Sequence, residues 1–388
     1  MDTRQFIAEH LDDDVHELAL KYRNAKVDMA LALRQIAARQ LLRRKVPSWS
    51  GNDALLFPQH LSLEQCSSEA TAQYKATLVQ GDTFADLTGG LGVDCHFLSK
   101  QFQHTDYVEA DAGLCTLAEH NFGVLGDRIR VCHRTAEDYL QDAAPVDCIF
   151  LDPARRDAHG RKTVSIADCT PDVTVLQDRL LQRARRVLLK LSPMLDLHQA
   201  LGQLHHVSEV HLVAVGNECK EVLFLLDPDH EGAPVFTCVN LHSDQPSVRF
   251  TEEEERSCQP LLAETVSHYL YEPNAALLKG GCFKLPTQRF GVRKLHPNSH
   301  LYTSDQWVAG FPGRTFRVEG WAPYNKKIGK TLLADVDKAS IATRNFPLTV
   351  AKLRKALSMA EGDTIYLFAT TLVGDRKVIV RTVKAVGE

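Results

Sequence analysis

The segment DLTGGLGVD, which begins at Asp86, has the residue types and spacing of a ligand-binding loop. An acid at the expected end of a strand is followed by Gly90 and Gly92, which lack a Cβ, so a ligand could press against their backbone. A helix beginning just beyond would add free amide donors and the positive end of its dipole. The segment therefore predicts a binding loop, with structural glycines in a tight strand–helix turn as the alternative.

A second acid follows at the end of the next expected strand, in YVEAD. Glu109, followed by Asp111, could accept both hydroxyls of a ribose, and it lies 17 residues beyond Gly92, close to the roughly 20 expected of a nucleotide-binding unit. The nicotinamide fingerprint GxGxxG is not met, because Cys95 stands in the place of its third glycine. The spacing argues against a nicotinamide cofactor, and a solvated acid is the alternative for Glu109.

The segment FLDPARRD places another acid at the end of the fourth expected strand. Asp152 would lie at the sheet edge where open α/β folds bind ligands, and it could orient a substrate nitrogen or take a proton from it. Pro153 would stiffen the turn, and Arg155 and Arg156 could grip a phosphate or a base. Lys190 ends the fifth strand at the same edge, either as a substrate contact or as a lysine with a buried stem and a solvated head.

These residues need a sheet to bring them together. Between Asp82 and about Leu226, short apolar runs alternate with helical stretches, which predicts an α/β fold with a mostly parallel, Rossmann-like sheet covered on both faces. Only GNECK separates the last two runs, so we expect a hairpin that sets the final strand antiparallel. The seven expected strands are TFADL, HTDYVEA, RIRVCH, VDCIFLD, RVLLKLS, EVHLVAV and EVLFLL.

The rest of the chain divides around this core. Apolar residues at helical spacing predict an N-terminal helical region over residues 1–80, followed by the core domain over 81–235. A helical linker is expected over 236–280, where TEEEERSCQPLLAETVSHYLY is typical of one or two helices. Strands bracketing one helix near the C-terminus predict a small α+β domain there.

The spacing of Asp86, Gly90 and Gly92 resembles the D/E-x-x-x-G-x-G motif of class I methyltransferases, which use S-adenosylmethionine (SAM). The resemblance implies SAM as the cofactor, with Asp86 near its amino-acid end and Thr88 where the family often has another glycine. It also implies that Glu109 holds the ribose, since the family usually uses the acid nearest the strand end.

The same resemblance extends to two later segments. In RTAEDYL, Ala136 and either Glu137 or Asp138 stand where the family contacts adenine, although an ordinary helix start is an equally good interpretation. Asp152 and Pro153 resemble the DPP or NPP motif of methyltransferases acting on nucleic acids, which lies beside both cofactor and acceptor. Because the chain has DPAR rather than DPPY, the target atom stays open.

The whole chain is similar to a bacterial family in which a helical N-terminus and a class I methyltransferase core precede a ferredoxin-like region and a THUMP-like domain. We place these last two at residues 281–324 and 325–388. THUMP domains help to present tRNA to modifying enzymes, so the resemblance implies delivery of an RNA. The segments that carry it are YLYEPNAALLKGG, FGVRKLHPNSHLYTSD, FPGRTFRV and RNFPLTVAKLRKAL.

The charge distribution agrees with a polyanionic partner. From Lys279 to Glu388 the chain has 19 Lys and Arg against 8 Asp and Glu, whereas the remainder has 26 against 41. Arg293, Lys294 and Arg314 are candidate phosphate contacts, with ordinary solvated side chains as the alternative.

Composition bounds the remaining possibilities. The ten cysteines are scattered without a CxxC or zinc-type cluster, so we expect no metal and a reducing, cytoplasmic environment. The acidic N-terminus does not resemble a signal peptide, and no stretch approaches the ~20 apolar residues of a membrane span.

We therefore expect a SAM-dependent methyltransferase that modifies a base in RNA, either tRNA or rRNA. A methyltransferase acting on a small molecule or a protein is one alternative. A non-catalytic RNA-binding protein with a relic cofactor fold is the other, and the intact acids and glycines argue against it.

Overall fold

The chain forms two compact units. The computed structural model describes residues 2–23, 26–58, 60–155, 165–325, 327–328 and 331–385. The first unit holds Met1–Val210 and Glu221–Gly232, and the second holds His211–Lys220 and Ala233–Glu388. Among the described residues, no helix combines the length and the apolar character that crossing a bilayer requires.

The first unit begins with a series of helices. The carboxylates of Asp2, Asp14 and Asp28 accept hydrogen bonds from first-turn amides, which fixes where the first three helices begin. Apolar residues of the long third helix pack with Trp49 and Phe57 in one buried cluster. The helices are α1 (Thr3–Glu9), α2 (Val15–Lys21), α3 (Met29–Lys45), α4 (Pro47–Ser50), α5 (His60–Gln65) and α6 (Glu69–Ala76).

The main sheet has, within the described residues, nine strands in the order β11-β10-β8-β9-β7-β4-β1-β2-β3. Strands β1, β2, β3, β4 and β7 are parallel and β9 is antiparallel to β7, which confirms the Rossmann-like fold and the antiparallel final strand. The connection from β8 to β9 is too short for the crossover that parallel strands need. The strands are β1 (Thr83–Asp86), β2 (His104–Glu109), β3 (Ile129–His133), β4 (Val146–Leu151), β7 (Ala184–Leu191), β8 (Val207–Val215), β9 (Glu218–Leu226), β10 (Val235–Leu241) and β11 (Val248–Thr251).

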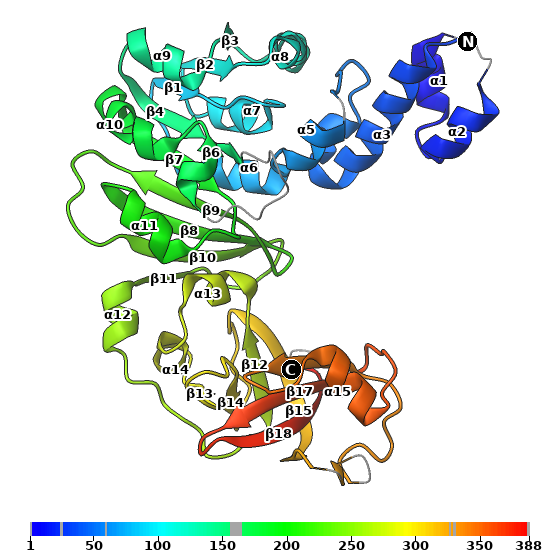
Figure 1. The fold of residues 1–388 in the computed structure, drawn as a ribbon, viewed down its shortest axis with the longest axis vertical. Coiled ribbons are helices and arrows are strands. Elements are labelled where there is room, and N and C mark those ends of the chain that lie inside the picture. Colours follow the sequence, from blue (N-terminus) through cyan, green and yellow to red (C-terminus); the bar gives the residue numbers. More distant parts are fainter. Residues whose placement is uncertain are drawn as a thin grey trace. The chain divides into compact units, whose positions relative to one another are not determined.

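Helices cover both faces of the parallel strands. In Figure 1, α6, α7 and α8 lie on one face, and α9, α10 and α11 lie on the other. This follows from the crossover connections, since each parallel strand is reached through a helix. The helices are α7 (Val93–Ser99), α8 (Ala112–Leu125), α9 (Ala136–Asp142), α10 (Val173–Arg183) and α11 (Leu197–Gln203), and the short elements β5 (Ala154–Arg155), η1 (Ile166–Asp168) and β6 (Cys169–Thr170) lie between β4 and α10.

The segment expected as a helical linker, 236–280, contains strands as well as helices. Strand β10, VFTCVNL, is buried along most of its length and pairs antiparallel with β11. The apolar, β-branched residues of β10 suit a buried strand, so the expected helical linker is wrong over β10 and β11. It is also wrong near its end, where β12 (Tyr269–Pro273) is a strand. The acidic segment that follows is helical: Thr251 and Glu254 form a reciprocal capping box at the start of α12 (Glu252–Ser257).

The second unit is built on another sheet, with the order β13-β14-β12-β15-β18-β17-β16. Most neighbours are antiparallel, whereas β16 and β17 are parallel and α15 connects them. Leu270, Phe316, Phe368 and Val380 meet in its core. The elements are β12 (Tyr269–Pro273), α13 (Ala275–Gly280), α14 (Leu285–Arg289), β13 (Arg293–Lys294), β14 (Tyr302–Ser304), β15 (Gly313–Pro323), β16 (Ser340–Arg344), α15 (Val350–Leu357), β17 (Ile365–Leu372) and β18 (Arg376–Lys384).

A buried ion-pair network fixes α6 to the core of the first unit. The ammonium of Lys75, which is fully buried, lies 2.8 Å from Glu221 Oε2 and 3.1 Å from Asp94 Oδ1. The Ser67 hydroxyl donates a 2.6 Å hydrogen bond to the other oxygen of Asp94. Burial raises the pKa of Glu221, and the Lys75 charge opposes that rise. The network thus ties the N-terminal helices to β9 and to the first turn of α7.

We expect Lys75→Met to lower the free energy of unfolding by about 3–5 kcal/mol, because Glu221 and Asp94 would stay buried without their cation. Lys220→Met is the control, since Lys220 pairs with Glu218 at the surface and its loss is expected to cost less than about 1 kcal/mol. Urea unfolding followed by circular dichroism measures both. Equal losses in the two variants would contradict the prediction.

Candidate active site

Four of the residues predicted to do chemistry lie at one edge of the main sheet. Asp86 and Glu109 are the last residues of β1 and β2, Asp152 directly follows β4, and Lys190 is the last residue but one of β7. These strands are neighbours in the order β7-β4-β1-β2 and all are parallel, so their carboxyl ends lie together. Open α/β sheets bind ligands at this edge.

The glycine loop between β1 and α7 is packed closely on two sides. A Cβ on Gly89 would lie 2.2 Å from the Tyr107 ring, and one on Gly92, whose φ is +83°, would lie 2.8 Å from Phe122. The Tyr107 hydroxyl donates a 2.6 Å hydrogen bond to the Gly90 carbonyl, which fixes the loop. The nearest atom to a Cβ on Gly90 would be 3.8 Å away. Gly89 and Gly92 therefore allow close packing, and Gly90 presents bare backbone that a ligand could touch; contact of Gly92 with a ligand stays a prediction.

Glu109 lies against this loop. One of its carboxylate oxygens accepts a 2.9 Å hydrogen bond from the Gly90 amide, and the other accepts a 2.9 Å hydrogen bond from the Asp111 amide. Asp111 has a different task, because its side chain accepts a hydrogen bond from Leu114 and caps α8. Each Glu109 oxygen keeps lone pairs for further donors.

The acids at this edge crowd one another. Asp86 is buried and accepts a 3.0 Å hydrogen bond from the Thr88 amide. Burial raises the pKa of Asp86 well above its ordinary value, the Thr88 hydrogen bond lowers it, and the charges of Asp94, Asp152 and Glu109 raise it further. A cation placed among these carboxylates would relieve their repulsion.

Thr88 joins the glycine loop to the loop after β4, because its hydroxyl accepts a 2.7 Å hydrogen bond from the Asp152 amide. The Asp152 carboxylate is ion-paired with the Lys190 ammonium. Burial disfavours the charged ammonium, but Asp152, Asp94 and Glu221 outweigh it and raise the pKa of Lys190. The Lys190 ammonium therefore lies against the Asp152 carboxylate, and its contact with a substrate stays a prediction.

The residues expected near adenine begin α9. Ala136 is buried and Glu137 is half-buried, both in the first turn of the helix. The Thr135 hydroxyl accepts a 3.1 Å hydrogen bond from the Asp138 amide and so caps the helix. Contact of Ala136 or Glu137 with a ligand stays a prediction.

The loop after β4 continues with Pro153, which is buried. Ala154 and Arg155 then form β5, whose backbone pairs with β6. The side chain of Arg155 and all of Arg156 lie outside the part of the chain that the structure describes. Their expected contacts with phosphate therefore stay predictions.

The three basic residues expected to meet phosphate differ in burial. Arg293 is exposed, and the Arg314 side chain is 42% exposed beside the buried Glu272. Lys294 is only 2% exposed, and its ammonium donates a 2.7 Å hydrogen bond to the Pro297 carbonyl. The expectation for Lys294 is therefore wrong, because successive residues of a strand point to opposite faces and Arg293 takes the outer one.

Comparison with known proteins shows the family. A crystal structure from Porphyromonas gingivalis W83, described as that of a proposed methyltransferase, is 36% identical over 99% of this chain and 98% of that chain, with a TM-score of 0.86. The chain belongs to this methyltransferase family. A family model described as a ferredoxin-like domain matches residues 269–312, and one described as THUMP domain-like matches residues 313–382. Both matches begin earlier than the ranges expected from the sequence.

More distant structures share only part of the chain. A structure from Listeria monocytogenes, described as a proposed class I SAM-dependent methyltransferase, is 10% identical over 62% of this chain and 93% of that chain, with a TM-score of 0.37. The T. thermophilus 16S rRNA N2 G1207 methyltransferase in complex with AdoMet and guanosine is 15% identical over 44% of this chain and 46% of that chain, with a TM-score of 0.35. No curated protein matches.

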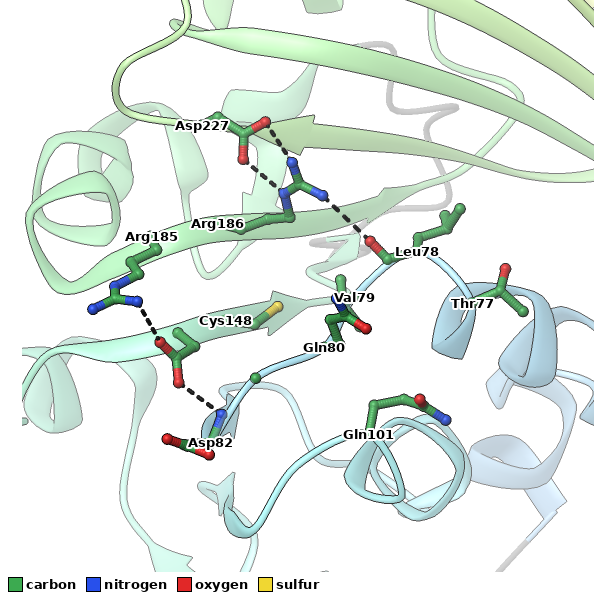
Figure 2. Close-up of a pocket in the computed structure, with 12 residues that line it drawn as sticks. Thr77, Leu78, Val79, Gln80, Asp82, Gln101, Cys148, Arg185, Arg186 and Asp227 are labelled. Carbon is green, nitrogen blue, oxygen red and sulfur yellow. Dashed lines mark hydrogen bonds and ion pairs between the residues drawn. The ribbon is translucent and has the colours of Figure 1, made fainter.

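This family member also has a hollow at the opposite edge of the sheet, where β1, β4 and β7 begin (Figure 2). There Arg186 binds Asp227 through two hydrogen bonds and also the Leu78 carbonyl, while Arg185 pairs with Asp147. The candidate site is at the opposite, carboxyl edge, where the glycine loop and the predicted acids lie together. The hollow is lined by Thr77, Leu78, Val79, Gln80, Gly81, Asp82, Gln101, Asp147, Cys148, Arg185, Arg186 and Asp227.

Sequence reasoning missed two contributors to the candidate site. Gly89 is needed because of the Tyr107 ring, and Asp94 adds a carboxylate beside Asp86 from the first turn of α7. Both stand inside DLTGGLGVD, so the motif contains them, but spacing alone does not distinguish them from their neighbours.

Gly89→Ala is expected to lower the free energy of unfolding by about 1–3 kcal/mol, because the new methyl group would overlap the Tyr107 ring. Gly123→Ala in α8 is the matched control: nothing lies within 4 Å of its added Cβ, and the change should stabilise the helix by about 0.5–1 kcal/mol. Urea unfolding of both variants measures the difference. A neutral Gly89→Ala would contradict the packing described here.

The burial of His300 beside Lys294 predicts that the stability of the protein depends on pH. Burial, together with the charges of Lys294 and Arg344, lowers the pKa of His300 from 6.5 to about 4. As the pH falls from 6.5 to 4, the unfolded chain binds a proton at this histidine and the folded chain does not, so the folded state loses stability. His300→Gln should remove this part of the loss, as measured by urea unfolding at pH 7 and at pH 4.5. An equal loss of unfolding free energy between pH 7 and pH 4.5 in the wild type and in His300→Gln would contradict this prediction.

Proposed function

We propose that the chain is a SAM-dependent methyltransferase that modifies a base in RNA. The observation that carries the proposal is that Asp86, Glu109 and Asp152 all lie at the carboxyl edge of the sheet, beside a glycine loop whose Gly90 amide donates a hydrogen bond to Glu109. Membership of the family of the Porphyromonas gingivalis protein supports methyl transfer.

The charges and hydrogen-bond acceptors of the site fit SAM. The buried Asp86 carboxyl and the neighbouring Glu109 carboxylate favour a cationic ligand, and SAM has a sulfonium and an ammonium group. The two Glu109 oxygens can each accept one ribose hydroxyl in addition to the amide they already bind. Thr88, Gly90 and Gly92 would shape the amino-acid end, and Ala136 and Glu137 would flank the adenine.

The protein must align the acceptor rather than activate the methyl group. When bound, SAM supplies a methyl group already activated by its sulfonium. Asp152 would accept a hydrogen bond or a proton from the acceptor nitrogen, while Lys190 holds the carboxylate in one orientation and the buried Pro153 limits the motion of the turn.

RNA is the acceptor that best fits the C-terminal third. The THUMP domain-like match and the excess of Lys and Arg after Lys279 both favour a polyanion. Arg293 and Arg314 are solvent-accessible and could meet its phosphates, with Arg155 and Arg156 as further candidates beside the acceptor. The ten cysteines are free thiols, in keeping with a cytoplasmic protein.

We expect Asp152→Asn to reduce methyl transfer by at least about 100-fold and to leave the affinity for SAM within a few-fold, because the loss falls on the acceptor. Transfer of radiolabelled methyl from SAM to RNA from cells lacking the gene measures the first quantity, and calorimetry measures the second. Asp111→Asn, which removes one charge at the same edge and keeps a helix cap, is the control. Loss of SAM binding in Asp152→Asn would show that the residue is misplaced.

Glu109→Ala, in contrast to Asp152→Asn, should weaken the binding of SAM. Two hydrogen bonds to a charged group contribute about 3 kcal/mol together, so SAM affinity is expected to fall by roughly 100-fold in calorimetry. An unchanged affinity, with Asp111→Ala weakened instead, would move ribose binding to the neighbouring acid.

Mass spectrometry of modified nucleosides tests the RNA part of the proposal. RNA from cells without the gene should lack one methylated nucleoside, and purified protein with SAM should restore it. If no nucleoside changes while the protein binds SAM, a small molecule or protein acceptor replaces RNA in the proposal.

A further inference from the structure

A single buried carboxylate in the second unit holds two arginines. Glu272 on β12 is 3% exposed. Its Oε2 accepts hydrogen bonds from Arg314 Nε, at 2.9 Å, and from Arg314 Nη2, and its Oε1 accepts a 2.5 Å hydrogen bond from Arg344 Nη2. Three charged groups from β12, β15 and β16 therefore meet at one point.

The topology explains why this contact is unusual. Glu272 and Arg314 are direct partners in the antiparallel pairing of β12 with β15. Arg344 ends β16, at the far edge of the same sheet, with β15, β18 and β17 between it and β12. The sheet must curl for Arg344 to reach Glu272, so the two arginines are brought together by the fold and not by a local turn.

The arrangement carries one more positive charge than it needs for balance. One arginine would neutralise Glu272, but two are present, and their side chains are 42% and 35% exposed. A guanidinium has five N–H donors, so both groups keep donors beyond those bound to Glu272. The positive charge of Arg344 also contributes to the low pKa of His300.

A preorganised pair of guanidinium groups suits one class of ligand. The planar fork of arginine matches the oxygens of a phosphate, and two forks can contact different oxygens of the same group. Anchoring at Glu272 fixes both side chains before a ligand arrives, which lowers the entropic cost of binding. Arg314 also lies over the Phe316 ring, 5.5 Å from its centroid, and this further restricts its motion.

We propose that Arg314 and Arg344, held together by Glu272, form a binding site for a phosphate group of the RNA. The proposal rests on the proposed RNA substrate and identifies the residues of the second unit that bind it. Glu272 belongs to the ferredoxin-like match and both arginines to the THUMP-like match, so the site is built at the junction of these two domains.

The test compares two full-length variants that change net charge equally. Glu272→Gln/Arg314→Gln/Arg344→Gln removes the whole cluster and leaves no buried charge without a partner. Arg317→Gln is the matched control, since Arg317 lies on the same strand as Arg314, is 57% exposed and forms an ion pair with Glu319 at 3.6 Å. Each variant lowers the net charge by one.

The binding of fluorescein-labelled, unfractionated bacterial tRNA is measured by anisotropy at several salt concentrations. The triple variant is expected to bind about 10–100-fold more weakly and to show a shallower salt dependence, because fewer counterions are released. Arg317→Gln should change the affinity by less than about 3-fold. Unchanged SAM affinity and thermal melting in each variant show that the fold is intact.

A second variant keeps the test valid if the triple variant does not fold. Arg314→Lys/Arg344→Lys keeps both charges beside Glu272 and loses only the fork geometry, so weaker tRNA binding here also supports the site. Comparing a 5′-phosphorylated RNA 12-mer with its dephosphorylated form separates a terminal phosphate from the backbone. If the variant loses affinity only for the phosphorylated RNA, the site binds the terminal phosphate. If it loses affinity equally for both RNAs, the site binds a backbone phosphate.

The outcomes distinguish this proposal from the RNA function itself. If wild-type protein binds tRNA and the folded cluster variant binds it equally well, the phosphate site is overturned and the RNA function stands. If wild-type protein binds no tRNA, the RNA function fails, and calorimetry with inorganic pyrophosphate decides the phosphate site. If wild-type protein binds pyrophosphate and the cluster variant does not, the phosphate site is supported. If wild-type protein does not bind pyrophosphate, the phosphate site is overturned.

Discussion

Charge balance at the carboxyl edge of the main sheet is the constraint on which the first unit depends. Carboxylates from three strand ends and from the first turn of α7 are packed within reach of one another, and two lysines offset them. One of these, Lys75, comes from α6, before the first strand of the sheet. The N-terminal helices are therefore part of the site's electrostatics, because without Lys75 the pair of Asp94 and Glu221 would be costly to bury.

The sequence predicts those features that depend on order along the chain. Asp86, Glu109, Asp152 and Lys190 stand at or beside strand ends because apolar runs stop at each of them, and parallel strands bring such ends to one edge. The antiparallel final strand follows in the same way from the short GNECK connection. These inferences need only periodicity and connection length.

What the sequence does not predict depends on contacts between distant residues. Lys294 has the composition of a surface residue, yet the pairing of β13 with β14 turns it inward beneath Pro297 and beside His300. The apolar residues of β10 suit a buried strand, but its place in the sheet is set by pairing with β8 on one side and β11 on the other. Thr88 likewise departs from the usual glycine for a reason visible only in space, since its hydroxyl binds the Asp152 amide.

The Glu272 contact has a consequence for how this family can evolve. The ferredoxin-like and THUMP-like regions are recognised separately, as adjoining matches to two family models. Their shared carboxylate removes that independence, because a ferredoxin-like module joined to a new neighbour would bury Glu272 without either arginine. The ferredoxin-like and THUMP-like regions should therefore be inherited together. A protein in which one region was replaced would need a new partner for the residues of the Glu272 ion pairs.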